Sequence, residues 1–348
     1  MIKLSISFLI TIIAILLVVL FIFMVYLLVQ RQRESHFENA RDRYIQNYSQ
    51  LWYDYLFNKE HFSMVLVPRG RAQVEAIELI FSSYLKNIIN EKVQCDIKQF
   101  SNQYLKKFYE KDLLSKRWSI RMNALYRIAD LQIDELLIMC QEFEKTKISE
   151  EEYFQLLKIY SIFQSNLFME KIKMPIVSYS ESEYRRLFVL LEDDVFIRFF
   201  DDFNSWPANI QFAVIDTAPV KRNMQYIDQL KKLLSHDVAE INIRALKGLY
   251  EMGVIDEIES YIPFVTSDMW EARLMVAKVF KHVPLTYSYS YLEQLLQDEN
   301  WWVRSQAAKT IVEDRYGIAK LQQFIESSND QYAIEMAQEI AARKEENK

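Results

Sequence analysis

The chain has 348 residues and a formal net charge of −6, and aromatic residues make up 14% of it. Its four glycines and six prolines argue against parallel α/β folds, which need glycines in turns and phosphate loops, and favour long helices joined by short turns. The acidic balance argues against nucleic-acid binding, and two distant cysteines without a CxxC pattern indicate idle thiols in a reducing compartment.

The first predicted element is a single transmembrane helix. Residues 4–29, 26 in number, carry no charge, and at 1.5 Å per residue they extend about 39 Å, more than a bilayer core of roughly 30 Å. No Ala-x-Ala site follows, which favours a signal anchor over a cleaved signal peptide. Four arginines follow the span and one lysine precedes it, so the positive-inside rule places the C-terminal part in the cytoplasm. We therefore expect a single-pass protein of the cell membrane, anchored by residues 1–30.

Residues 31–115 are interpreted as membrane-proximal helices and an N-terminal cap. Helices are predicted over 34–56, 71–89 and 95–109, and Pro68 and Gly70 break the chain between the first two. In the first of these helices, five residues fall near one face: Tyr44, Tyr48, Leu51, Trp52 and Tyr55.

Residues 116–348 contain an internal repeat. Each unit has a polar turn, an apolar residue, a polar residue that we call the anchor, and apolar residues three, four and seven positions after the anchor. The anchors are Arg121, Gln211, Asn242, Arg273, Arg304 and, in a weaker match, Ala333. Successive anchors from 211 to 304 are 31 residues apart. Degenerate matches near Tyr153 and Tyr184 fill the interval between 121 and 211.

The spacing predicts helical hairpins. Apolar residues at +3, +4 and +7 line one helix face, and a second amphipathic run follows in each unit, at 224–234, 255–265, 289–296 and 318–325. A hairpin of this kind buries its apolar face only by stacking on its neighbours, so the units predict a solenoid over 116–348.

One unit resembles the HEAT-repeat family, whose pattern is an Asp, a Val-Arg pair, two small apolar residues and a Leu. The matching residues are Asp298, Val303, Arg304, Ala307, Ala308 and Ile311. The resemblance implies an all-α fold, a right-handed α-α superhelix of armadillo type, here preceded by the transmembrane helix. It also implies protein binding or scaffolding, with no catalysis and no cofactor.

Tryptophans mark the starts of several repeats. Trp118, Trp270 and Trp301 each lie three residues before an anchor, and Trp302 adds a second indole. Equivalent positions stack in a solenoid, so Trp270 and Trp301 are expected to form a strip. Packing between repeats is one explanation, and a binding surface is the other, because Trp is favoured in interface hot spots. The candidate partner-binding residues are Trp270, Trp301, Trp302, Arg273 and Arg304.

Few residues in the sequence indicate a metal site, a catalytic pair or an anion-binding site. The four histidines are dispersed without metal-ligand spacing, and adjacent acids such as Asp193 and Asp194 point about 100° apart on a helix, which does not make an acid/base pair. Arg185, Arg186 and Lys221 are weak candidates for an anion site, with solvated helix faces as the alternative explanation.

The sequence therefore predicts a membrane-anchored scaffold or regulatory subunit rather than an enzyme. Its expected partners are the lipid bilayer and a protein of a membrane complex, with no nucleic acid, metal or cofactor. Anchored HEAT-like proteins resemble bacterial accessory components, for instance beside membrane glycosyltransferases or envelope polysaccharide systems. The alternative is a cytoplasmic small-ligand sensor tethered to the membrane, with Arg185, Arg186 and Lys221 in its pocket.

Overall fold

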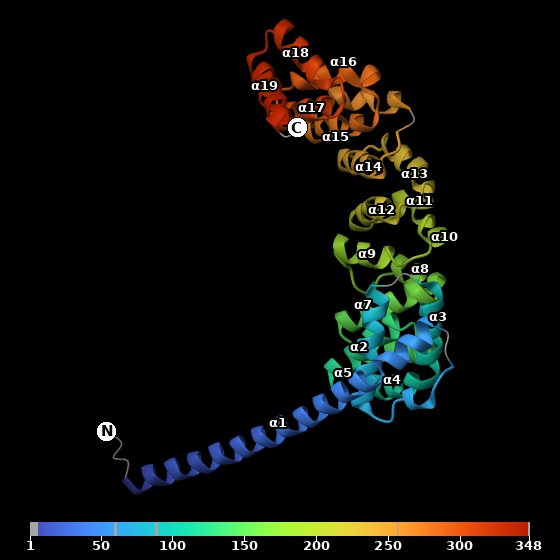
Figure 1. Cartoon of the computed structure of the whole chain (residues 1–348), viewed down its shortest axis with the longest axis vertical. Coiled ribbons are helices and arrows are strands. Elements are labelled where there is room, and N and C mark those ends of the chain that lie inside the picture. The colour runs from blue at the N-terminus through green and yellow to red at the C-terminus, as the bar shows by residue number, and fades with distance from the viewer. Residues whose placement is uncertain (1–5, 59–60, 88–89, 256, 347–348) are drawn as a thin grey trace. The chain divides into compact units, whose positions relative to one another are not determined.

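The computed structural model describes residues 6–58, 61–87, 90–255 and 257–346, and all regular secondary structure in these ranges is helical (Figure 1). The predicted all-α fold is confirmed. The chain forms two compact units, Met1–Gln164 and Ser165–Lys348. The predicted boundaries near residues 30 and 115 remain predictions.

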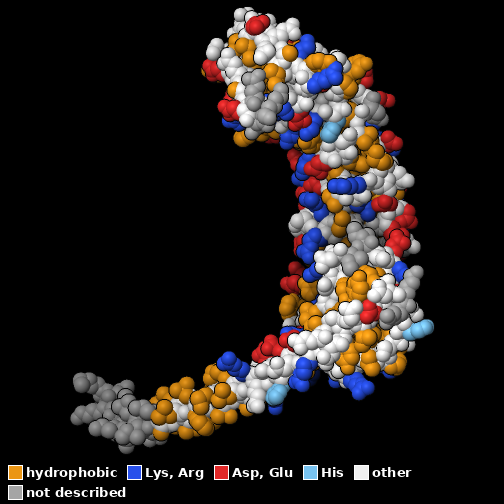
Figure 2. Space-filling view, in the orientation of Figure 1, with side chains coloured by type: hydrophobic (Ala, Val, Ile, Leu, Met, Phe, Trp, Pro, Cys, Tyr) orange, Lys and Arg blue, Asp and Glu red, His pale blue; other side chains and the backbone are white. Residues whose placement is uncertain are grey.

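The first unit begins with α1 (Ile6–Phe57), which is one uninterrupted helix rather than an anchor followed by a separate membrane-proximal helix. The stretch Ala14–Phe57 contains an 18-residue window with a mean hydropathy of 2.5, long and apolar enough to cross a membrane, and none of that window is buried. Figure 2 shows the described start of this helix as a continuous apolar surface.

The C-terminal part of α1 belongs to the core of the first unit. Tyr44, Trp52 and Leu56 are buried, and the Trp52 ring lies edge-on to Phe81 and Phe100 with centroids 4.8 Å away in each case. The buried residues follow a four-residue spacing along one helix face. Leu51 lies about 100° away from Trp52 around the helix and is exposed.

Seven further helical segments belong to the first unit, besides two short 3-10 helices at Met64–Leu66 and Asp134–Leu136. They are α2 (Arg71–Asn87), α3 (Glu91–Phe100), a π-helical turn (Ser101–Leu105), α4 (Lys106–Leu113), α5 (Trp118–Asp130), α6 (Leu137–Glu144) and α7 (Glu150–Phe163). The helix predicted from residue 95 begins earlier, at Glu91, because the Asn90 side chain caps it by accepting from the main-chain N–H groups of Lys92 and Val93.

The second unit is built from helices that pack in series. These first helices of the repeats are α9 (Glu181–Phe188), α12 (Ala208–Lys221), α14 (Ala239–Met252), α15 (Trp270–Val279), α17 (Trp301–Glu313) and α19 (Gln331–Glu346). Each packs against the next along the chain. α8 (Ser165–Lys173) precedes these helices, and the α-helices between them are α10 (Asp193–Phe196), α11 (Arg198–Asp201), α13 (Gln225–Leu233), α16 (Leu285–Leu296) and α18 (Gly317–Ser327).

The repeat register predicted from the sequence agrees with the helix starts. The anchors Arg121, Gln211, Asn242, Arg273 and Arg304 are each the fourth residue of a helix, as are Tyr153 in α7 and Tyr184 in α9. Ala333 is the third residue of α19. The small residues that follow the anchors are fully buried, which lets neighbouring helices approach closely: Ala245, Ala277, Ala307 and Ala308.

One predicted helix takes a different form. The run 255–265 contains two short 3-10 helices, Ile258–Ser260 and Ile262–Thr266. Pro263 has no N–H and locks its own φ, and it disfavours α geometry at the residue before it. Gly253, with a φ of +73°, ends α14 just before this segment.

Candidate functional site

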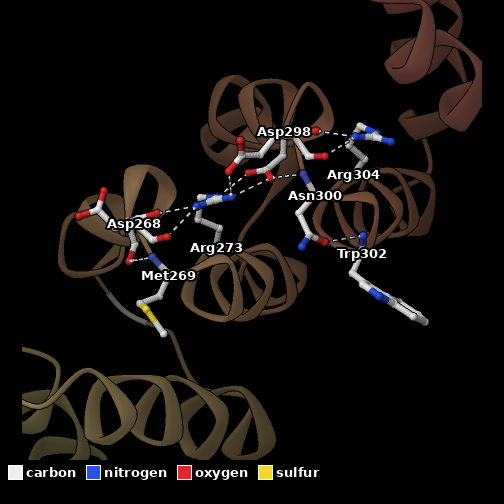
Figure 3. Close-up of polar contacts among 9 residues, drawn as sticks. Asp268, Met269, Arg273, Asp298, Asn300, Trp302 and Arg304 are labelled. Atoms are coloured by element: carbon white, nitrogen blue, oxygen red, sulfur yellow. Dashed lines mark hydrogen bonds and ion pairs between the residues drawn. The ribbon is translucent and has the colours of Figure 1, made fainter.

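The start of α15 is joined to the start of α17 by Arg273 (Figure 3). Its guanidinium donates to the Ser267 carbonyl at 2.7 Å and to both carboxylate oxygens of Asp298, at 2.6 and 3.0 Å. Asp298 also accepts from the main-chain N–H of Asn300 at 2.8 Å. Because Ser267 precedes α15 and Asp298 precedes α17, this one side chain holds two helix starts side by side.

Two other arginine anchors make an equivalent contact. Arg121 donates to the Ser115 carbonyl at 3.0 Å, and Arg304 donates to the Asp298 carbonyl at 2.7 Å. As with Arg273, each acceptor lies six residues before its anchor. Arg121 also has an acidic partner in the next repeat, since its Nε lies 2.7 Å from Glu152 Oε1.

The amide anchors, Gln211 and Asn242, also donate to a main-chain carbonyl in the preceding turn, with a shorter side chain. Gln211 donates to the Phe203 carbonyl at 3.0 Å and Asn242 to the Leu234 carbonyl at 2.5 Å, each acceptor lying eight residues earlier. These five polar anchors therefore share one structural role, which is to tie the first helix to the turn before it. Main-chain carbonyls in turns have no helical partner, so such a donor satisfies a group that would otherwise be unpaired.

The predicted tryptophan strip lies beside these contacts and faces outward. Trp301 is 46% and Trp302 60% exposed, and their rings meet edge-to-face with centroids 4.8 Å apart. Trp270 and Met269 are exposed at the neighbouring start of α15. In Figure 3 the Trp302 indole and the Met269 side chain point away from the ion pair.

The strip continues onto the last repeat. Tyr332, the second residue of α19, is 71% exposed, and the Arg304 guanidinium lies 5.7 Å from the centroid of its ring. We call the exposed residues at these three helix starts the aromatic edge: Met269, Trp270, Trp301, Trp302 and Tyr332. The sequence prediction named three of them. Met269 and Tyr332 were missed, although they stand within one position of the equivalent tryptophans.

Trp118 belongs to the first unit, whereas the aromatic edge belongs to the second. Its indole N–H donates to the Ser149 hydroxyl at 3.1 Å. That contact joins the starts of α5 and α7, so Trp118 has a packing role as well as an exposed face.

The Arg273 side chain makes its contacts within the repeat array rather than with solvent. Its side chain is only 10% exposed, and the hydrogen bond to Asp298 raises the pKa of the guanidinium further above its ordinary value. Arg304 is half-buried and directs its Nη1 to the carbonyls of Asp298 and Glu299. The structure therefore gives both predicted arginines a structural role under the exposed indoles.

The three predicted anion-binding residues do not meet. Arg185 and Arg186 line a shallow cavity of about 350 Å³ between α9 and α12, together with Ser182, Val189, Thr217 and Val220. Lys221 is absent from that lining. Its Nζ donates to the Leu191 carbonyl at 2.6 Å and lies 3.1 Å from Asp193, and its side chain is 9% exposed.

A charge cluster that the sequence did not predict crosses three helices. Arg244 of α14 donates to Glu181 of α9 and to Asp216 of α12, both at 2.8 Å. Its guanidinium also lies 4.3 Å from the centroid of the Phe212 ring. Burial raises the pKa of Asp216 despite Arg244. At Glu181 burial also acts to raise the pKa, but the hydrogen bonds with Arg244 and Asp216 and the nearby arginine charges together outweigh burial and lower it.

The metal-ligating and thiol side chains of the described ranges form no candidate metal centre. Among these residues, no group of three or more His, Cys, Asp or Glu is arranged to hold a metal ion. Cys95 is an exposed free thiol and Cys140 a buried one.

Comparison with known proteins gives one family match. The HEAT repeat model matches residues 289–313, a segment that covers the second half of α16 and all of α17. No curated protein matches the chain. A crystal structure of an engineered protein is 14% identical to it and covers 78% of this chain and 79% of its own, with a TM-score of 0.32. The family match and the series of helical hairpins support a HEAT-like repeat protein.

Proposed function

We propose that this chain is a membrane-tethered scaffold, in which α1 inserts into the cell membrane and the helical repeats bind a protein partner at the aromatic edge. The observation that carries the proposal is the set of exposed indoles at adjacent helix starts, above side chains that fix those starts in place.

The tether is supported by the exposure and the continuity of α1. None of its apolar window is buried, so the structure gives this stretch no core to pack into. Arg41 joins the helix to the rest of the unit, since its Nη1 lies 3.0 Å from Glu75 Oε1. From Gln30, where the apolar run ends, to Arg41 the helix rises about 17 Å. A bilayer-inserted α1 would thus hold the first unit on a short helical stalk on the cytoplasmic side.

The binding role is supported by the chemistry of the edge. Trp and Tyr bury large areas at low cost in side-chain entropy and dominate interface hot spots. A scaffold needs a rigid binding surface, and here two of the three helix starts are fixed by the nearly buried pair of Arg273 and Asp298. By resemblance to anchored bacterial HEAT-like proteins, we propose a membrane complex as the partner, such as a glycosyltransferase or an envelope polysaccharide system.

Site-specific photo-crosslinking tests this function. The full-length protein would carry p-benzoylphenylalanine in place of Trp302 and be irradiated in native membranes. We expect one reproducible protein partner from position 302. The matched control is the same substitution at Tyr287 of α16, which is 70% exposed but lies outside the edge. Capture that is absent at 302, or equal at both positions, would exclude the edge as the binding surface.

A small-ligand sensor is the second candidate, and the cavity beside Arg185 and Arg186 is the observation that favours it. Ligand binding stabilises the folded state by mass action. A panel of phosphorylated metabolites and nucleotides would therefore raise the thermal midpoint of the wild-type protein by several degrees and leave the Arg185→Ala, Arg186→Ala variant unchanged. A panel without any shift would remove this candidate.

A further inference from the structure

We infer that the aromatic edge binds an extended, basic segment of its protein partner. The inference rests on the proposed function and specifies the chemistry that the edge recognises.

Carboxylates lie close in sequence to the exposed rings, and two of them, Glu271 and Asp330, are half-buried. Asp268 and Glu271 flank Trp270, Glu299 lies two residues before Trp301, and Asp330 lies two residues before Tyr332. The Glu299 side chain is 89% exposed. Each helix start carries roughly half a positive charge from its dipole, which is less than the full charge of each carboxylate beside it.

The cations of the edge do not cancel this field. Arg273 lies 2.6 Å from Asp298 and 3.4 Å from Glu299, so its single positive charge is outnumbered by these two carboxylates. Arg304 directs its Nη1 to two main-chain carbonyls and lies 5.7 Å from the Tyr332 ring centroid, and its charge offsets one further carboxylate. The remaining carboxylates make the edge electronegative, and exposed indole faces add an attraction for Lys and Arg through their quadrupoles. Such a surface favours a partner that alternates apolar and basic side chains.

The dimensions of the edge favour an extended chain. The edge is formed by the first turn of each helix, so its width along the helix axes is about 5 Å. A helix that docked there would be about 10 Å across and would extend beyond the edge. Adjacent packed helices lie roughly 8–10 Å apart, and an extended chain rises about 3.3 Å per residue. A segment with an apolar residue at every third position therefore matches the step from α15 to α17 to α19.

The bilayer fits the edge less well than a basic protein segment does, because the edge and the cytoplasmic membrane surface are both negatively charged. Indoles favour membrane interfaces, but the cytoplasmic leaflet carries a negative surface potential. Asp268 and Glu299 would be brought against that potential if the edge lay on the membrane. A basic protein segment gains from the carboxylates that a membrane surface would repel.

The test uses the full-length protein in phosphatidylcholine nanodiscs and two fluorescent ten-residue peptides, each with leucine at every third position. One carries lysine between the leucines and the other glutamate. We expect the lysine peptide to bind at least 10-fold more tightly, with an affinity that falls as salt is raised from about 50 to 500 mM. Replacing Trp301 and Trp302 together by Ala should weaken binding at least 10-fold. Glu299→Lys should weaken it several-fold.

Matched variants control for folding and for total charge. Tyr287→Ala removes an exposed ring and Glu326→Lys reverses an exposed charge, both outside the edge. These two variants should bind the lysine peptide like the wild type. Equal or tighter binding of the glutamate peptide would overturn the inference, and so would binding that the edge variants leave unchanged.

Two further outcomes separate the partner class from the proposed function. If photo-crosslinking at position 302 captures a neutral or acidic segment, the scaffold function stands and the basic partner is wrong. If that position captures no partner, the function itself fails. Shielding of the indoles from iodide in peptide-free nanodiscs that contain anionic lipid would assign the edge to the bilayer and overturn the inference.

Discussion

Arg273 and Asp298 form a nearly buried ion pair between consecutive repeats, with side chains 10% and 7% exposed and an Nε–Oδ2 distance of 2.6 Å. Removing Asp298 leaves the nearly buried Arg273 with only the longer contact to Glu299, at 3.4 Å, and breaking a buried pair in this way typically costs several kcal/mol. We expect Asp298→Ala to lower the free energy of unfolding of the second unit by about 3 kcal/mol, measured by urea denaturation.

The control for this change is Glu339→Ala, which breaks an exposed pair with Arg343 within α19. Exposed pairs contribute little, so its loss should be below about 0.5 kcal/mol. The combined Arg273→Met, Asp298→Leu variant should recover most of the stability because no unpaired charge remains. A loss for Asp298→Ala as small as that of the control would show that the pair is not needed.

A second prediction about stability concerns the amide anchors Asn242 and Gln211. Asn242→Ala removes the donor to the Leu234 carbonyl, so the free energy of unfolding should fall by about 1 kcal/mol. Asn242→Gln should lose less, because Gln211 makes the same contact with the longer side chain. Equal losses for both variants would argue that packing, rather than the hydrogen bond, sets the residue type at this position.

The repeat register was predictable from the sequence because it depends on local spacing. Apolar residues three, four and seven positions after each anchor define a helix face, and the polar turn before it marks the helix start. The tryptophan strip was predictable by the same argument, since Trp270 and Trp301 occupy equivalent positions in adjacent repeats.

Contacts between distant positions were not predictable in this way. Arg244 lies 63 residues from Glu181 in sequence, and no periodic signal links them. Lys221 was grouped with Arg185 by charge alone, whereas the structure directs it to Asp193 and the Leu191 carbonyl. The continuity of α1 was also missed, because the apolar run and the amphipathic run were read as separate elements.

Truncation distinguishes the two parts of α1. Removing residues 1–30 deletes the apolar run but leaves Tyr44, Trp52 and Leu56 in the core. We expect this shortened protein to move from the membrane fraction to the soluble fraction and to keep the helical circular dichroism of a folded protein. Persistence in the membrane fraction would contradict the tether.

Removing residues 1–57 makes the matched comparison. It strips Trp52 from Phe81 and Phe100, and loss of a buried Trp side chain alone costs about 3–5 kcal/mol. We expect the first unit to lose its cooperative unfolding transition and the protein to aggregate. A stable, monodisperse product would show that this end of α1 is dispensable.

The two cysteines should differ sharply in reactivity. Cys140 is fully buried, and burial raises the pKa of its thiol to about 12, whereas Cys95 is exposed. The thiolate is the reactive form, so at pH 8 we expect a thiol reagent such as Ellman's reagent to modify one cysteine rapidly in the native protein. Both should react in urea. Cys95→Ser should abolish the rapid phase, and a rapid phase that survives this change would contradict the burial of Cys140.

Asp193 gives a prediction for acid pH. Burial raises the pKa of this carboxyl, but hydrogen bonds from Tyr226, Asn223 and Lys221 outweigh burial and hold the pKa below its ordinary value. The folded state therefore favours the ionised form. Its contribution to stability is fully present above the unfolded pKa of about 4, and it is lost as the pH falls through the lower folded pKa. We expect Asp193→Asn to lower the thermal midpoint near pH 7 and the difference from wild type to shrink below pH 4.

The control is Asp201→Asn, an exposed carboxylate on α11, which should leave the midpoint nearly unchanged at every pH. A difference for Asp193→Asn that grows toward pH 3 would mean that the carboxyl is stabilised in its protonated form instead.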